Sequence, residues 1–235
     1  MADQNHSFEF LNGEGTWDKG VLQHNFTSKA LGSDLSINGK FPFADLNKDS
    51  VTRVDWKNLD LEKLPLKKGQ AWSPSQGMVS GNVSLTGPIP KESETFPGKL
   101  KGALKFDVQN LKLLNNDSQS ISFNQLEGSG ELVNNKLNYR IKGDPFNGTL
   151  QSDGRISLST SKASAPVLNN RIEFSNLDLN QLPLSEKPDK GSLSGTIQLN
   201  GPLPDPENFL TGKLKIDTTF KLNDIKMSNP PLDIQ

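Results

Sequence analysis

The chain repeats itself once, and this repetition constrains the fold more than any other feature of the sequence. Two long phrases recur: VDWKNLDLEKLPL at 54–66 returns as IEFSNLDLNQLPL at 172–184, and GMVSGNVSLTGPIP at 77–90 returns as GSLSGTIQLNGPLP at 191–204. Shorter matches link 13–17 with 128–132, 39–41 with 154–156, and 98–101 with 212–215. Self-similarity of this kind indicates a supersecondary unit whose copies stack and bury one continuous apolar face.

The repeats divide the chain into two units after a short leader. Unit one is predicted to run over 8–117 and unit two over 118–235, continuous with unit one, while 1–7 is expected to be a disordered or added leader. Length differences between the copies fall in polar or proline-containing stretches, as loop insertions do. Residues 230–235 stand where unit one passes into unit two. We therefore expect both ends of the chain to be cuts through a longer array, with a further unit beginning at the last residues.

Apolar and polar residues alternate along both units, which is the period of a β-strand with one wet face. The longest such row holds Leu100, Gly102, Leu104, Phe106 and Val108. Gly-Pro and Asn-Asn pairs separate the rows at hairpin spacing, which predicts about six strands per unit. The repeated NLDLxxLPL phrase, at 58–66 and 176–184, is expected to form a short helical turn.

The apolar content favours one layer of sheet over two. Apolar residues make up 32% of the chain, and its 20 glycines raise the fraction to about 40%, below the 45–50% of ordinary domains. A two-layer core needs more apolar surface than this, whereas a single sheet with one apolar face needs less. We therefore predict an all-β fold, an extended curled antiparallel sheet that forms an open β-groove or half-barrel from the two tandem units.

Charge and cysteine content exclude several classes of function. The net charge is -1, from 26 basic and 27 acidic residues spread along the chain, which argues against nucleic-acid binding through phosphates. The absence of cysteine excludes disulfides, thiolate metal sites and a cysteine nucleophile. The first residues lack the basic and apolar regions of a signal peptide. The sequence therefore predicts either a cytoplasmic protein or a piece whose targeting segment has been removed.

Several of the repeated phrases resemble the AsmA-like superfamily, which includes AsmA, TamB-like translocation proteins and the N component of type II secretion. They are LSGTIQLNGPLP at 193–204 with LTGKL at 210–214, and the NLDLNQLPL phrase that precedes them. The resemblance covers nearly the whole chain through both copies and rests on glycine and leucine spacings. It implies a β-groove in the periplasm, anchored in the inner membrane through a segment that this sequence lacks, with no catalytic residues or metal ligands.

The resemblance and the strand pattern together predict a non-enzymatic groove segment. It would bind or conduct phospholipid acyl chains between membranes, or support outer-membrane assembly, without a cofactor. An acyl chain suits such a groove, because each buried methylene contributes about 0.8 kcal/mol without a specific partner. The alternative is a structural scaffold of a secretion system, similar to the type II secretion N component, that binds envelope or secretion-system proteins and no lipid. A polysaccharide hydrolase would need clustered carboxylates, and the carboxylates here are scattered.

The residues predicted to line the groove occupy the alternating positions that carry the apolar side chains of each strand. They are Leu35, Ile37, Val79, Val83, Leu85, Leu100, Leu104, Phe106, Leu137, Tyr139, Ile141, Leu193, Ile197, Leu199, Leu214, Ile216 and Phe220.

Two further features could carry chemistry, and each has a simpler explanation. His24 lies in the alternating run with Leu22 and Phe26, which favours a packing role over that of a catalytic base. The carboxylate spacing at 45–49 is that of a calcium loop, but Ser50 replaces the glycine that such a loop needs at its sixth position, so a solvated turn is the better interpretation.

Glycines interrupt the apolar rows at positions that correspond between the units. Gly39 corresponds to Gly154 and Gly81 to Gly195, while Gly102 lies in the longest row. Glycine within a strand weakens it and marks a bend, a bulge or a close approach to the backbone. Two hypotheses follow: the glycines allow the sheet to coil sharply, or they leave room for a ligand chain against the backbone.

Overall fold

The fold is one antiparallel sheet in which the strands follow each other in the order of the sequence. The structure, a computed structural model, describes residues 8–64, 72–88, 97–115, 119–158, 165–184, 187–203 and 213–227. Its strands pair in the order β1 to β12, and every pair is antiparallel. The predicted all-β fold is confirmed.

Six strands lie in each predicted unit of the described chain. The first six are β1 (Phe8–Asp18), β2 (Val21–Ala30), β3 (Ser33–Pro42), β4 (Ser50–Asp60), β5 (Trp72–Gly87) and β6 (Lys101–Asn115). The second six are β7 (Ser120–Val133), β8 (Lys136–Gly143), β9 (Thr149–Ser157), β10 (Val167–Asp178), β11 (Lys190–Pro202) and β12 (Lys215–Lys226). Two 3-10 helices complete the fold, η1 (Leu61–Lys63) and η2 (Pro145–Asn147). The helix η1 confirms the helical turn in the first copy of the NLDLxxLPL phrase, after 58–60, which belong to β4. In the second copy, 179–181 form a turn and not a helix.

Two-residue turns set the register of three hairpins. They are Lys19-Gly20, Leu31-Gly32 and Asn134-Asn135, and φ is positive at both residues of each turn. Such turns match the right-handed twist of the strands that they join. Asn134-Asn135 confirms the hairpin predicted from this Asn-Asn pair, whereas Asn169-Asn170, another such pair, lies inside β10 and does not separate strands.

A bulge recurs at the same place in both units. The register shifts between Trp56 and Leu59 in β4 and between Phe174 and Leu177 in β10. In each shift an asparagine adopts the left-handed conformation, with φ 55° at Asn58 and 54° at Asn176. The asparagine N–H donates to a serine hydroxyl of the next strand, 3.0 Å from Ser80 Oγ for Asn58 and 2.9 Å from Ser194 Oγ for Asn176.

A second left-handed residue also recurs in both units. Asn110 of β6 has φ 52°, and Asp224 of β12 has φ 51°. Asn and Asp tolerate this conformation better than other residues with side chains. The two units are therefore alike in backbone conformation as well as in sequence.

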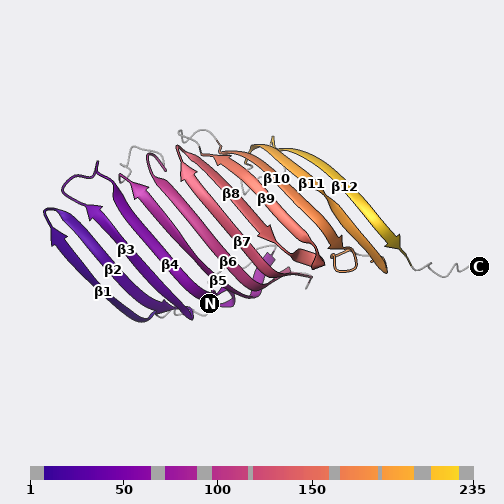
Figure 1. Cartoon of the computed structure of the whole chain (residues 1–235), viewed down its shortest axis with the longest axis horizontal. Helices are drawn as coiled ribbons and strands as arrows, with labels where there is room; N and C mark the ends of the chain where they lie inside the picture. The colour runs from indigo at the N-terminus through magenta and orange to yellow at the C-terminus, as the bar shows by residue number, and fades with distance from the viewer. Residues whose placement is uncertain are drawn as a thin grey trace, which may run out of the picture.

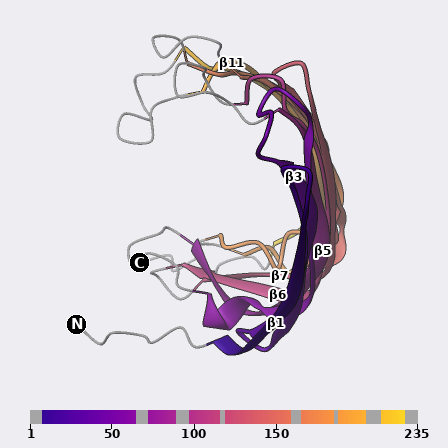
Figure 2. The same ribbon diagram turned by 90° about the vertical axis from the view of Figure 1, so that its left-hand side faces the viewer.

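The strands are bowed, so the sheet forms a trough. Seen across its width, the sheet spreads from β1 at one end to β12 at the other (Figure 1). Seen along that long axis, its profile is a C, and both 3-10 helices lie toward one rim (Figures 1 and 2). The trough therefore runs across the strands, with a convex outer face and a concave inner face.

Some of the buried leucines lie where the NLDLxxLPL phrase turns back onto the sheet. Leu61 and Leu111 pack against the backbone of Gly77. A Cβ atom added to Gly77 would lie 3.1 Å from Leu61 Cδ1 and 3.4 Å from Leu111 Cδ1. Unit two repeats the arrangement, with Leu179 Cδ1 2.8 Å from the corresponding position on Gly191. Leu111 and Leu179 are each 6% exposed. The buried core is divided between the two rims: Leu111, Leu177 and Leu179 lie toward this one, whereas Leu100 and Leu168, at the starts of β6 and β10, lie toward the other.

The centre of the trough is packed differently from its rim. The main contacts between described elements join neighbouring strands, or join strands to η1 and η2. No described element lies as a second layer over the middle of the concave face. If the ends are cuts through a longer array, the strand edges at 8–11 and at 232–235 are expected to be unpaired. In the described chain β1 pairs only with β2, and 232–235 lies outside the described residues.

Candidate functional site: the concave face

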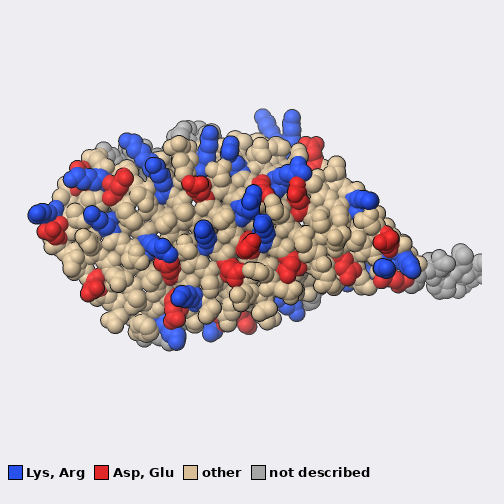
Figure 3. Space-filling view, in the orientation of Figure 1, with Lys and Arg blue, Asp and Glu red and all other residues tan. Residues whose placement is uncertain are grey.

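The two faces of the sheet differ in chemistry. Lys, Arg, Asp and Glu are scattered over the convex face (Figure 3). Side chains on neighbouring strands that lie opposite one another share a face. The alternating residues that do not carry these charges therefore face the inside of the trough, and most of them are apolar.

One line of paired residues crosses the trough from end to end, and we call it the central row. It consists of Gly13, Phe26, Ile37, Val54, Val83, Leu104, Gly130, Tyr139, Gly154, Asn170, Leu199 and Ile216. Its polar groups are the Asn170 amide and the Tyr139 hydroxyl. Each member lies directly opposite the next, so the row forms an apolar stripe from β1 to β12.

The structure places most of the predicted groove residues on this concave face. Members of the central row are Ile37, Val83, Leu104, Tyr139, Leu199 and Ile216, and residues of the same parity in rows beside it are Leu35, Val79, Leu85, Phe106, Leu137, Ile141, Leu193, Ile197 and Phe220. The remaining two, Leu100 and Leu214, precede their strands. Leu100 is buried, with Cδ2 3.3 Å from the position of a Cβ on Gly87, so it contributes to packing and not to an open surface.

Aromatic rings cover most of the glycines on this face. A Cβ on Gly81 would stand 2.6 Å from Trp56 Cζ2, and one on Gly195 would stand 2.9 Å from Phe174 Cζ. In the other corresponding pair, the His24 ring lies over Gly39 and the Tyr139 ring over Gly154. Each ring belongs to the residue directly opposite its glycine.

This arrangement bears on one of the two hypotheses for the row glycines, that of room for a ligand chain. Leu85 covers Gly102 in the same way, with Cδ2 2.9 Å from the position of a Cβ there. The space beside all five glycines is therefore filled by the protein itself. The hypothesis that they leave room for a ligand chain is wrong: they accommodate side chains of the neighbouring strand.

An apolar pocket lies at the β1 end of the concave face. Its volume is about 350 Å³, and it is lined by Leu11, Phe26, Thr27, Ser28, Leu35 and Ile37. Leu35 and Ile37 were predicted from the sequence, whereas Leu11 and Phe26 were not. The alternating run of Leu22, His24 and Phe26 carried the signal for Phe26.

A small polar cluster interrupts the apolar surface in unit two. Ser152 Oγ donates to Asn170 Oδ1 at 3.0 Å, and both side chains are buried. Burial raises the pKa of the neighbouring Tyr139 phenol, and a hydrogen bond with Ser152 partly opposes that shift. The sequence analysis missed Ser152 and Asn170, because polar residues at these positions break the apolar alternation.

His24 packs among aromatic rings. Its ring lies 5.5 Å from the rings of both Phe26 and Phe41, stacked on each. Its Nδ1 is buried and has no hydrogen-bond partner among the described residues. The geometry therefore agrees with the predicted packing role.

Replacing His24 with phenylalanine tests that role. We expect His24→Phe to leave stability unchanged or raise it by up to about 1 kcal/mol, because stacking is kept and an unsatisfied buried nitrogen is removed. His24→Ala, which removes the ring from Gly39, is expected to be less stable than either. Urea denaturation measures all three proteins. A larger loss for phenylalanine than for alanine would show that the imidazole has a role beyond packing.

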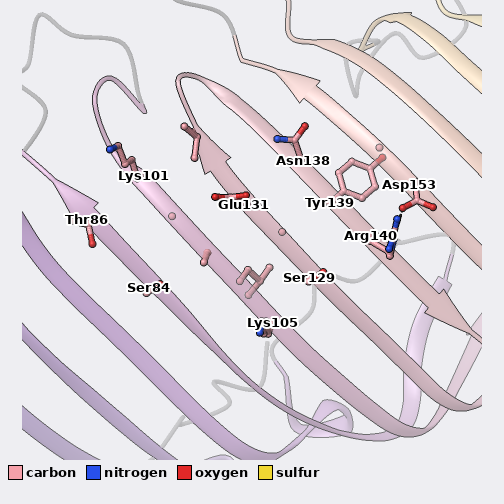
Figure 4. Close-up of a pocket in the computed structure, with 16 residues that line it drawn as sticks. Ser84, Thr86, Lys101, Lys105, Ser129, Glu131, Asn138, Tyr139, Arg140 and Asp153 are labelled. Atoms are coloured by element: carbon pink, nitrogen blue, oxygen red, sulfur yellow. Dashed lines mark hydrogen bonds and ion pairs between the residues drawn. The ribbon is translucent and has the colours of Figure 1, made fainter.

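The convex face has an open depression of about 870 Å³ over β5 to β9 (Figure 4). Charged side chains of both signs stand in it, among them Lys105, Glu131 and the ion pair of Arg140 with Asp153. Hydrogen bonds from Arg140, and then from Gln151, hold the pKa of the Asp153 carboxyl below its usual range. An exposed ion pair of this kind contributes little to binding or stability. We therefore take the concave face as the candidate site.

The suspected calcium loop forms a turn. The Asn47 N–H donates to Asp45 Oδ1 at 3.1 Å, which is an Asx turn. Across the described ranges, no group of three or more His, Cys, Asp or Glu side chains is placed to hold a metal ion.

Comparisons of the chain with family models, with curated proteins and with solved structures find no match. Within the part of the chain that the structure describes, no helix combines the length and the apolar character needed to cross a membrane. The AsmA-like resemblance stays a prediction from the repeated phrases, and the site is defined by its own geometry.

Proposed function

We propose that this protein is a non-enzymatic β-groove segment that holds the acyl chains of phospholipids on its concave face. The observation that carries the proposal is the central row, an apolar stripe that crosses all twelve strands with no described layer over its middle. Large exposed apolar surfaces on soluble proteins mark binding sites for apolar ligands, membranes or partners. A stripe that is long and narrow matches an extended chain better than a compact ligand.

The energetics suit an acyl chain. Ten buried methylenes contribute about 8 kcal/mol before the costs of ordering the chain are subtracted. The contribution is non-directional, so a chain can occupy any part of the row and slide along it. The pocket beside Ile37 supplies a deeper position at one end of the row.

The proposed setting follows from the resemblance and not from the geometry. An AsmA-like protein would place this groove in the periplasm as part of an inner-membrane-anchored protein. There it would conduct lipid between membranes or support outer-membrane assembly. Two features favour such an array: the repeated bulges at Asn58 and Asn176, and the single sheet that passes from unit one to unit two without a break.

A matched pair of charge substitutions tests lipid binding. Ile37 and Val51 are similarly exposed, at 38% and 41%, but Ile37 lies on the concave face and Val51 on the convex face. We expect Ile37→Asp to reduce retention of a fluorescent phospholipid at least tenfold, because a carboxylate in the row would have to be desolvated by the chain. Val51→Asp should retain lipid as the original protein does. Native mass spectrometry of gently purified protein provides the second measurement.

Each result of this test bears on the proposal. Both variants should keep the circular dichroism spectrum of the original protein, since water reaches both positions. Equal retention by both variants, or no lipid on the original protein in either measurement, would contradict the proposal. In that case the scaffold hypothesis, in which the same face binds envelope or secretion-system proteins, would replace it.

A further inference from the structure

The described sheet ends in two edge strands, β1 and β12, that differ from each other. The outer sides of β1 and β12 have no partner among the described strands. Phe220 and Ile216 of β12 are 68% and 60% exposed, and Leu11 of β1 is 70% exposed. Unpaired strand edges with apolar side chains are templates for pairing with another strand.

The edge strand β12 is the equivalent of β6. In unit one, Phe106 of β6 lies opposite Gly81 of β5. In unit two, Phe220 of β12 lies opposite Gly195 of β11. In both strands the residue four positions after this phenylalanine, Asn110 in β6 and Asp224 in β12, adopts the left-handed conformation. The side of β12 that faces away from β11 therefore corresponds to the side of β6 that binds β7.

The edge strand β1 is the equivalent of β7. Its Gly13 and Gly15 correspond to Gly128 and Gly130 in the repeat. Gly13 pairs with Phe26 of β2 in the same register as Gly128 pairs with Ile141 of β8. The side of β1 that faces away from β2 therefore corresponds to the side of β7 that binds β6.

The pairing of β6 with β7 at the centre of the chain is therefore a template for a pairing of β12 with β1. In the β6–β7 junction, Phe106 lies opposite Gly128 and Val108 lies opposite Leu126. We propose that the outer edge of β12 binds β1 of a second copy of this chain, antiparallel, with Phe220 opposite Gly13. The same register places Leu222 opposite Leu11.

The charges on the convex face agree with this register. It places Lys215 opposite Asp18, and opposite charges on facing residues stabilise a strand pair. Asp217 lies opposite Thr16 and Lys221 opposite Asn12, so neither meets a like charge, while Asp224 and Glu9 form the one like-charge pair, close to the end of the contact. The contact differs from the central junction in one respect: the Phe26 ring already lies over Gly13. Phe220 therefore meets an aromatic ring as well as the glycine backbone.

The proposed contact joins β12 of one copy to β1 of the next, so a dimer still has one unpaired β1 edge and one unpaired β12 edge. Head-to-tail contacts that do not close by symmetry give open chains of copies. Because the trough runs across the strands, each added copy lengthens the concave face by twelve strands. This inference does not depend on which ligand the face binds.

Engineered cysteines test the register, since the chain has no cysteine of its own. The variant carries Leu222→Cys together with Leu11→Cys, which face each other across the proposed contact. Within one chain these strands are eleven spacings apart, roughly 50 Å, so a disulfide can form only between copies. After mild oxidation we expect a ladder of covalent dimers and longer species on a non-reducing gel, which collapses to monomer on reduction.

A register-shifted pair is the control. Ile216→Cys with Leu11→Cys leaves the two thiols roughly 20 Å apart in the same contact, so this variant should stay monomeric. All three residues are exposed, and circular dichroism checks that both variants fold. Equal cross-linking of the two variants would indicate random collision and overturn the proposal. So would absence of cross-linking in the first variant at high concentration, with the unmodified protein sedimenting as a monomer.

Discussion

Leu111→Ala will lower the free energy of unfolding by about 2–5 kcal/mol. Leu111 is 6% exposed and packs with Leu61 of η1 against Gly77. Truncation removes the transfer free energy of the buried side chain and leaves a cavity that the strand backbone on either side cannot close. Urea denaturation followed by circular dichroism measures the loss.

Leu104→Ala is the matched control, because Leu104 lies on the same strand and the same face. It is 36% exposed, as a member of the central row. Only part of its surface is removed from water in the native protein, so the expected loss is smaller, about 1–2 kcal/mol. Losses of equal size at the two positions would mean that the centre of the face is covered as well as its rim, and the open-trough description would fail.

Gly128→Ala is expected to cost about 1–3 kcal/mol, although it adds a single methyl group. The added Cβ would occupy the space of the Phe106 ring, which lies over this glycine where unit one meets unit two. The ring would have to swing off the strand and lose its contact with the backbone. The same denaturation experiment measures the change.

Gly130→Ala provides the comparison from the same strand and the same face. The nearest atom to its added Cβ is Leu137 Cδ1 at 3.4 Å, an ordinary contact. This substitution should be neutral or stabilise the protein by about 0.4–1 kcal/mol, because alanine restricts the unfolded chain. If Gly128→Ala and Gly130→Ala behave alike, the ring over Gly128 does not determine the cost.

A double-mutant cycle with Phe106→Leu isolates the ring-on-glycine contact. Leucine does not reach across the strand as the phenyl ring does, so Gly128→Ala should cost less in the Phe106→Leu background. The expected coupling is about 0.5–3 kcal/mol, the range for residues in direct contact. Additive effects would show that the two positions act independently.

The covered glycines explain how a single sheet with an open face can be stable. Trp56, Tyr139, Phe106 and Phe174 each lie over a glycine of the neighbouring strand. Their rings bury apolar area against the backbone of their own sheet, where another protein would need a second layer. Glycine provides the required space, and the large area of an aromatic ring offsets the weakness of glycine in a strand. Among the described residues, the sheet therefore needs no second layer over the floor of the trough.

The sequence by itself determined the strands, the repeat and the assignment of residues to faces. Alternation has a period of two, and a strand has the same period, so Val83 and Ile197 are placed on the apolar face by their neighbours in the chain alone. The two-residue turn at Asn134-Asn135 is equally local, because φ is positive at both residues and asparagine tolerates it.

Only the tertiary structure decided what each face residue touches. Leu100 and Leu104 belong to one predicted row, yet Leu100 is buried beside Gly87 and Leu104 lies on the open stripe. Parity assigns a face, but burial depends on where along its length a strand meets a turn or rim. The partner across each strand depends on register, which bulges such as that at Asn58 shift. That is why the sequence located Gly81 and Gly195 in apolar rows but could not place Trp56 and Phe174 over them.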